Sequence, residues 1–182
     1  MKFKFSAQKA TQAAARFLRL WHGNVTYGRL VKLLYIADRE ALKKWGTPIT
    51  GDKFFSLPNG PIVSRIYDLS KGAVKDPVWN KFIVNKSRCV LTVSQDPGVS
   101  RLSRAEVALL DSVFAEHGGK TWEQLVEFCH TFKEWRDPVQ VQKKQLPLDP
   151  EMILHLSGWK ISEIRALEAQ GEENEILDAL LA

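Results

Sequence analysis

Two segments near the N-terminus have residue patterns typical of helices, and in the second of them apolar residues recur at spacings of three and four. The first segment, Ser6–Trp21, is rich in alanine and contains no Gly or Pro, which favours a helix. The second segment, Thr26–Trp45, is also expected to be helical. Its predicted apolar face consists of Tyr27, Leu30, Val31, Leu34, Ala37, Ala41 and Trp45. Gly46 is a good helix terminator, and Pro48 prevents the helix from continuing.

Turn-forming residues are dense in the next segment, residues 49–72. "TGD" and "PNG" bracket "KFFSL", whose aromatic residues favour a short strand. Pro61 suits the first position of a helix, because its missing N–H is harmless there. We therefore expect a helix from Pro61 to about Gly72. Its predicted apolar face consists of Ile62, Val63, Ile66, Tyr67 and Leu69.

The second half of the chain begins with a predicted β-hairpin, "KFIVNKSRCVLTVSQDPG" at residues 81–98. Two capping boxes follow, and they mark the starts of two helices. The cap residues are Ser103 with Glu106 and Thr121 with Gln124. The second of these helices is expected over residues 121–135, before the break at Asp137-Pro138. After "EMILHLSG", two short helices are expected, beginning at Ser162 and at Glu172. The alternative for the last segment, "GEENEILDALLA", is a frayed tail.

These patterns predict a mostly α (α+β) fold, a compact helical domain with a small antiparallel hairpin inserted in the middle. At 182 residues, with 45% hydrophobic and 26% charged residues, the chain has the size and composition of one globular domain. We expect a single domain over residues 1–182, of which residues 140–182 form a C-terminal helical extension.

Charge is divided unequally along the chain. Residues 1–104 carry 19 Lys and Arg against 6 Asp and Glu, a net charge of +13. Residues 105–182 carry 7 against 15, a net charge of −8. If the fold separates these parts, a basic surface would attract nucleic acid or an acidic protein. If they pack together, the charges neutralise each other, and the sequence leaves both alternatives open.

Cysteine content and hydropathy bear on the compartment. Cys89 and Cys129 are the only cysteines, with no C-x-x-C motif, which fits a reduced setting. No apolar run follows "MKFKF", so no signal peptide is expected. The apolar segment "LVKLLYIA" contains Lys32 and stops at Asp38, far short of a membrane span. We expect a cytoplasmic protein with no membrane partner.

The sequence offers few candidates for chemistry. Glu127, His130 and Glu134 form one Glu-x-x-His arrangement, but no second motif of that spacing accompanies it, so we expect no metal. Phosphate-binding loops and the G-x-S-x-G motif are absent. Asp38 and Asp52 could act in acid–base chemistry with Asp68. We expect these carboxylates to pair instead with the nearby residues Arg39, Lys53 and Arg65.

Three motifs lie between residues 32 and 68: K-L-L-Y-x-A-D, G-x-P-I-T-G-D and L-P-x-G-P-x-x-S-R-x-Y-D. "LSRAEVALLDSV" and the pair His130 and Trp135 follow in the second half. With these motifs the chain resembles the Panacea domain of the SocA-like antitoxin family, phage-associated proteins, over roughly residues 10–140. It departs from the family pattern at Asn59, where many relatives have His before Gly-Pro. The substitution argues further against catalysis.

The resemblance implies a non-enzymatic antitoxin without a cofactor, which neutralises a cognate toxin by direct binding. The toxin gene is usually adjacent, and many family members lie in prophages. Because SocA itself is a proteolytic adaptor, a protease is a further possible partner. A DNA-binding regulator of its own operon and a small enzyme that uses the motif carboxylates are the alternatives. The charge pattern alone does not predict a nucleic-acid partner, and a homodimer stays open.

The motif residues are candidates either for partner contacts or for holding the domain together. They are Asp38, Arg39, Asp52, Arg65, Asp68, His130 and Trp135. We favour the second interpretation, in which variable surface such as residues 85–88 or the C-terminal helices contacts the partner. One further hypothesis is that the acidic C-terminal part, with Glu172, Glu173 and Glu175, mimics nucleic acid toward a basic groove of the toxin.

Overall fold

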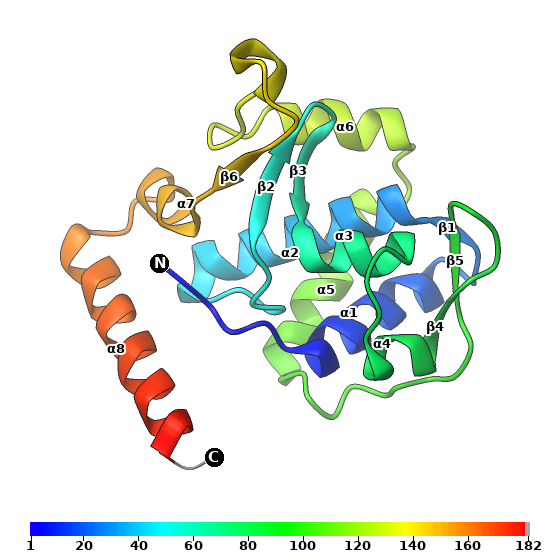
Figure 1. Cartoon of the computed structure of the whole chain (residues 1–182), viewed down its shortest axis with the longest axis horizontal. Coiled ribbons are helices and arrows are strands. Elements are labelled where there is room, and N and C mark those ends of the chain that lie inside the picture. Colours follow the sequence, from blue (N-terminus) through cyan, green and yellow to red (C-terminus); the bar gives the residue numbers. More distant parts are fainter. Residues whose placement is uncertain (181–182) are drawn as a thin grey trace.

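Helix α2 (Tyr27–Trp45) is the element around which the rest of the molecule packs in the computed structural model (Figure 1). The structure describes residues 1–180, with side chains described for residues 1–173 and Leu180. Helices α1, α3, α5, α6 and α7 and strand β3 all contact α2. Its buried residues therefore extend beyond the one apolar face that the sequence predicts, and Leu33, Tyr35 and Ile36 are among them.

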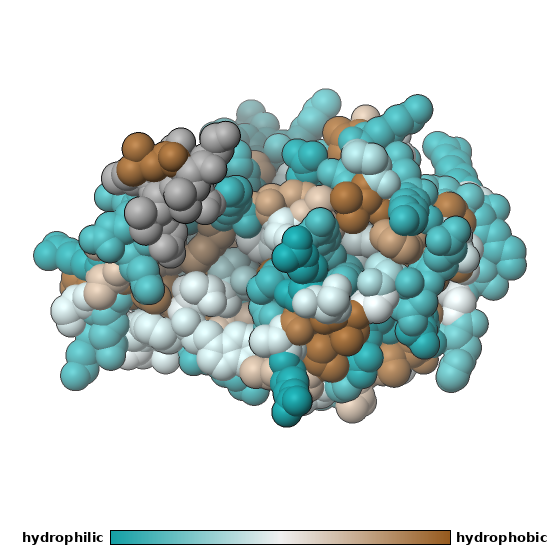
Figure 2. Space-filling view, turned by 90° about the horizontal axis from the view of Figure 1, so that it is seen from below, coloured by the Kyte–Doolittle hydropathy of each residue, from teal (hydrophilic) through white to brown (hydrophobic). Residues whose placement is uncertain are grey.

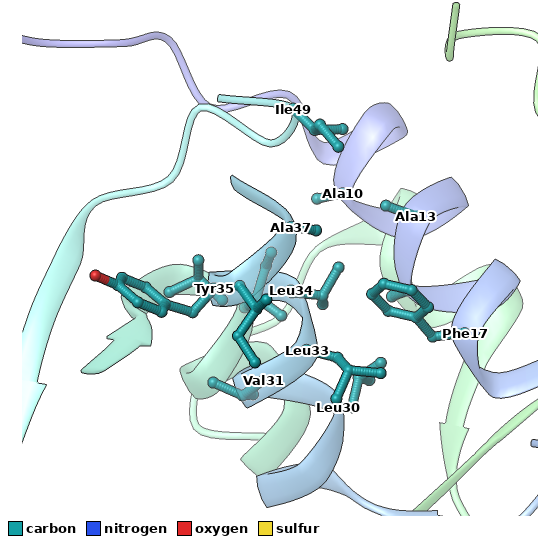
Figure 3. Packing of buried hydrophobic residues seen from close by; sticks show 14 of the residues in the cluster. Ala10, Ala13, Phe17, Leu30, Val31, Leu33, Leu34, Tyr35, Ala37 and Ile49 are labelled. Atoms are coloured by element: carbon teal, nitrogen blue, oxygen red, sulfur yellow. The ribbon is translucent and has the colours of Figure 1, made fainter. Parts of the chain in front are cut away.

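Helix α1 (Ala7–Leu20) packs against α2 through small side chains (Figure 3). Ala10, Ala13 and Phe17 are fully buried there. Because alanine has a short side chain, the two helices can approach closely, and the core fills with Leu and Phe. The alanine residues of α1 therefore favour the helix and also form its packing surface toward α2.

The predicted limits of α1 and α2 are confirmed to within one residue, and so is the predicted start of α5 after Ser103. Ser6 caps α1 by accepting a hydrogen bond from the Lys9 N–H (3.2 Å), and Gly46 ends α2 with φ of 74°. Both predicted capping boxes are present, at α5 and at α6. The bounds of the second-half helices are α5 (Arg104–His117), α6 (Trp122–His130), α7 (Pro150–Leu156) and α8 (Ile161–Leu180), with a 3-10 turn, η1, at Pro138–Val141.

Two small antiparallel sheets are present in the described part of the chain. One has the order β3-β2-β6 and the other β1-β5-β4. The hairpin predicted at residues 81–98 is confirmed as β4 and β5, which pair Ile83 with Val93. The strands are β1 (Val25–Thr26), β2 (Phe54–Leu57), β3 (Gly60–Val63), β4 (Ile83–Asn85), β5 (Val90–Val93) and β6 (Leu146–Leu148).

Pro61 corrects the sequence prediction, since it lies in β3 and does not begin a helix. It is opposite Ser56 in a tight β2–β3 hairpin, and helix α3 (Ser64–Lys71) starts three residues later. Strand β3 is at the edge of its sheet, where a residue without an N–H is tolerated. The apolar residues Ile62 and Val63 therefore belong to the strand.

Three further helices differ from the prediction. Helix α4 (Pro77–Phe82) was not predicted; the Asp76 carboxylate caps it by accepting from the Val78 and Trp79 N–H groups. Helix α6 ends at His130, five residues earlier than expected. Helix α8 continues through Gly171 as one helix, because a single glycine costs only about 1 kcal/mol in a helix interior.

The basic and acidic parts of the chain pack together. Lys9 Nζ donates to Glu106 Oε1 (2.7 Å), and Arg16 binds Asp111 through two hydrogen bonds of 2.5 Å between α1 and α5. The structure therefore favours the alternative in which charges partly neutralise each other. On the face shown in Figure 2, apolar residues form separate patches among hydrophilic ones. No helix in the described residues is long and apolar enough to cross a membrane.

Truncation of a central α2 residue tests how much the fold depends on this helix. Leu34 is fully buried, so Leu34→Ala should lower the free energy of unfolding by about 3 kcal/mol, because it removes apolar contacts and leaves a cavity. Val84→Ala, at an exposed position, is the control and should change it by less than about 0.5 kcal/mol. Urea denaturation followed by circular dichroism measures both, and equal effects would contradict a core centred on α2.

Candidate functional site

The three sequence motifs meet around the β2–β3 hairpin. Helix α2 lies along one side of the hairpin, α3 leaves its second strand, and α6 lies near its tip (Figure 1). Pro58 and Asn59 form the turn at the tip and are exposed.

Asp38 fixes the connection between α2 and the hairpin. It is fully buried, and its carboxylate accepts hydrogen bonds from the Ile49 N–H (2.9 Å), the Thr50 N–H (3.0 Å) and the Thr50 hydroxyl. Burial raises the pKa of Asp38 to about 7, although the hydrogen bonds from Thr50 act in the opposite direction. The carboxylate thus holds the loop after α2.

Asp52 holds the start of α3. Its carboxylate accepts from the backbone N–H groups of Lys53 (2.7 Å), Arg65 (3.0 Å) and Ile66 (2.9 Å), and burial raises its pKa. The expected pairing of Asp38 and Asp52 with side chains of Arg39, Lys53 and Arg65 is therefore wrong. Both carboxylates bind backbone N–H groups, because the first turn of a helix and tight loops leave such donors without partners.

Arg39 forms a buried cluster with the segment after α6. Arg39 Nε donates to Glu134 Oε1 (2.5 Å), and the Tyr35 hydroxyl donates to the same oxygen (3.1 Å). The guanidinium carbon lies 4.1 Å from the centre of the Phe132 ring. This cluster ties residues 132–134 to α2, which explains why α6 ends at His130 and the chain turns back.

His130 and Trp135 hold the hairpin tip. Trp135 Nε1 donates to the Leu57 carbonyl (3.0 Å), and His130 Nε2 lies 3.0 Å from the Pro58 carbonyl, which can only accept. The two rings stack with their centres 4.0 Å apart. Both side chains thus position the backbone of the tip.

The remaining two motif residues lie on α3. Arg65 is exposed, with its guanidinium over the Phe5 ring (5.1 Å) and 3.7 Å from the Asp76 carboxylate. Asp68 is half-buried, and its carboxylate has no hydrogen bond or ion pair within the described residues. The structure therefore brings five of the seven predicted residues to the supports of the hairpin and leaves Arg65 and Asp68 outside them.

Lys32 is a site residue that the sequence reasoning missed. Its side chain is 1% exposed, and Nζ donates to the Pro61 carbonyl (2.9 Å) and lies 5.8 Å from the centre of the Trp122 ring. Burial lowers its pKa to about 8. The signal was a lysine inside the apolar segment "LVKLLYIA", at the start of the motif K-L-L-Y-x-A-D, but Lys32 was not among the predicted site residues.

A pocket of about 280 Å³ opens beside Lys32 at the hairpin tip. It is bounded by α2, the tip of the β2–β3 hairpin, α3 and α6. The lining residues are Tyr27, Gly28, Val31, Lys32, Leu57, Pro58, Asn59, Ile62, Tyr67 and Trp122. We name it the hairpin pocket.

A metal site is not assembled from the candidate ligands. Glu134 is occupied by Arg39, and His130 contacts the hairpin. Within the described part of the chain, no three His, Cys, Asp or Glu side chains are grouped to hold a metal ion.

The pH dependence of stability tests the burial of Asp38. A carboxyl group with a raised pKa binds its proton more tightly in the folded state, so its contribution is greatest at low pH. It should decline as the pH rises from about 4 to 7, by at most about 1.4 kcal/mol per pH unit. Asp38→Asn should remove this component, and urea denaturation at pH 4, 5.5 and 7 measures it. Asp68→Asn is the control, and a slope equal to wild type in the Asp38 variant would refute the assignment.

The Arg39–Glu134 pair is tested by Glu134→Leu. This change removes the buried one of the two carboxylates that the Arg39 guanidinium binds, and leaves only the pair with Glu40 (3.0 Å). We expect a loss of about 3 kcal/mol in the free energy of unfolding. Glu127→Leu, at an exposed position of α6, should have little effect. A loss no greater than that of the control would show that the pair does not support the hairpin.

The comparison with known families identifies one match. The family model described as "Antitoxin SocA-like, Panacea domain" matches residues 30–136, more than half of the chain. The matched range begins in α2 and ends directly after Trp135, so it includes every support of the hairpin. No curated protein and no solved structure gives a match.

Proposed function

The chain belongs to the SocA-like antitoxin family with its Panacea domain, and we propose that it neutralises a cognate toxin by direct protein–protein binding. Family membership supports an antitoxin role. Beyond the family role, we propose that the chain binds one toxin and that the adjacent gene encodes it.

The main support for the proposal is that the motif carboxylates hold the fold together. Asp38 and Asp52 are buried and bound to backbone N–H groups, so they serve to hold a shape. A general acid or base needs access to a substrate proton, which neither carboxylate has. The motifs thus support a scaffold that presents a fixed surface, as a stoichiometric binder requires.

The hairpin tip has the composition of a binding surface. Exposed Pro58 and Asn59 lie beside the half-buried rings of Tyr27, Tyr67 and Trp122. Aromatic side chains in a well-packed setting supply much of the affinity in protein interfaces. Because the tip is held by His130 and Trp135, little of its conformational freedom would be lost on binding.

The hypothesis that the acidic C-terminal part mimics nucleic acid has less support than a contact through the hairpin tip. Glu172 and Glu173 on α8 are exposed, whereas the side chain of Glu175 lies outside the described residues. Glu168 nearby lies 3.2 Å from the N-terminal ammonium and is partly neutralised. Among the residues whose side chains the structure describes, no acidic surface is assembled that would be favoured over the hairpin tip.

Co-expression with the adjacent gene product tests the proposal. We expect that gene alone to arrest growth, and this chain to restore growth and to co-purify with the product in a fixed ratio. The Val84→Ala variant should restore growth equally well. Failure to co-purify, or turnover of a small compound that Asp52→Asn abolishes without unfolding, would contradict the proposal. A salt-dependent shift of promoter DNA without toxin binding would support the regulator instead.

A further inference from the structure

The hairpin pocket contains a buried positive charge without a carboxylate partner. Among the described residues that line it, Lys32 alone is charged. An ammonium group has three N–H donors, and Lys32 uses one of them in the bond to the Pro61 carbonyl. In the part of the chain that the structure describes, no carboxylate lies within ion-pair distance of Nζ. Burying such a charge is unfavourable unless an anion compensates it.

Three of the walls of the pocket are aromatic rings, from Tyr27, Tyr67 and Trp122. Tyr27 and Tyr67 meet edge to face with their ring centres 5.9 Å apart. The pocket therefore offers apolar contact to the body of a ligand and one positive group, the Lys32 ammonium, to an anionic end.

Gly28 allows this shape. A Cβ atom at Gly28 would lie 2.7 Å from Trp122 Cζ3, closer than two non-bonded carbon atoms can approach. The absence of a side chain lets the Trp122 ring lie directly on α2, where it forms one wall of the pocket beside Lys32.

From these features we infer that the hairpin pocket receives an acidic side chain, Asp or Glu, from the partner protein, with Lys32 as its counter-ion. The inference rests on the proposed function, because it assigns the site through which the toxin is bound. A glutamate or aspartate carboxylate would accept the unused N–H donors of Lys32, while its methylene groups contact the aromatic walls. Asn59 at the rim offers a further donor.

Two pairs of variants test the inference in the complex with the adjacent gene product. Lys32→Met keeps the volume of the side chain and removes its charge, and Lys75→Met at an exposed position is its control. Asn59→Trp blocks the mouth without touching the core, and Asn80→Trp, also exposed, is its control. We expect Lys32→Met and Asn59→Trp each to raise Kd at least about 30-fold, while the controls stay near wild type.

The acidic residue of the toxin can then be identified. Each Asp and Glu of the toxin is changed to Asn or Gln, and one of these changes should weaken binding as much as Lys32→Met does. Combined with Lys32→Met it should weaken binding little further, since both remove the same contact. Melting temperatures establish that the variants are folded. If Lys32→Met does not fold, the affinity of Asn59→Trp alone tests whether the pocket contacts the toxin.

The outcomes separate this inference from the proposed function. Wild-type affinity in both Lys32→Met and Asn59→Trp would overturn the pocket while toxin neutralisation stands. A loss of binding in Asn59→Trp but not in a folded Lys32→Met variant would show that the pocket takes an apolar side chain, and would overturn the carboxylate. If the wild-type chain does not bind the toxin, the proposed function falls and the inference falls with it.

Discussion

The hydrogen bonds that the Asp38 carboxylate accepts from Ile49 and Thr50 are the constraint on which the hairpin depends. They fix the loop between the most buried helix and strand β2. Asp52, at the end of the same loop, likewise accepts hydrogen bonds from backbone N–H groups, and these fix the start of α3. With both ends of the hairpin held in this way, α6 and the segment after it need only support the tip. Burying the Asp38 and Asp52 carboxyl groups is unfavourable, and hydrogen bonds from backbone N–H groups offset that cost.

Much of the fold could be predicted from the sequence, because its signals were local. Capping residues and helix-terminating glycines act within one turn, so α1, α2 and α5 were placed closely. Pro61 was misplaced because its preference for a first helical turn is a local signal, whereas its strand position depends on pairing with Ser56. The same limit applies to α4, whose short length gives little periodicity to detect.

The candidate site was predictable only in part. The sequence motifs indicated Asp38, Asp52, His130 and Trp135 as candidates, but they could not show that these side chains bind backbone groups. A charge pattern suggests pairs of opposite charge, and buried carboxylates can be satisfied equally well by N–H donors. Lys32 was overlooked for a related reason: a lysine inside an apolar segment does not show which residues it meets, and Trp122 of α6 lies about ninety residues later in the chain.

The distance in sequence between the hairpin and its supports has a consequence for synthesis on the ribosome. His130 and Trp135 contact carbonyls 72 and 78 residues earlier in the chain. A growing polypeptide can form α1 and α2 as they emerge, but its hairpin tip stays without these contacts until residue 135 has left the exit tunnel. An incomplete translation product would therefore lack the contacts that hold the hairpin tip, and the pocket beside it would be complete only after most of the chain has been made.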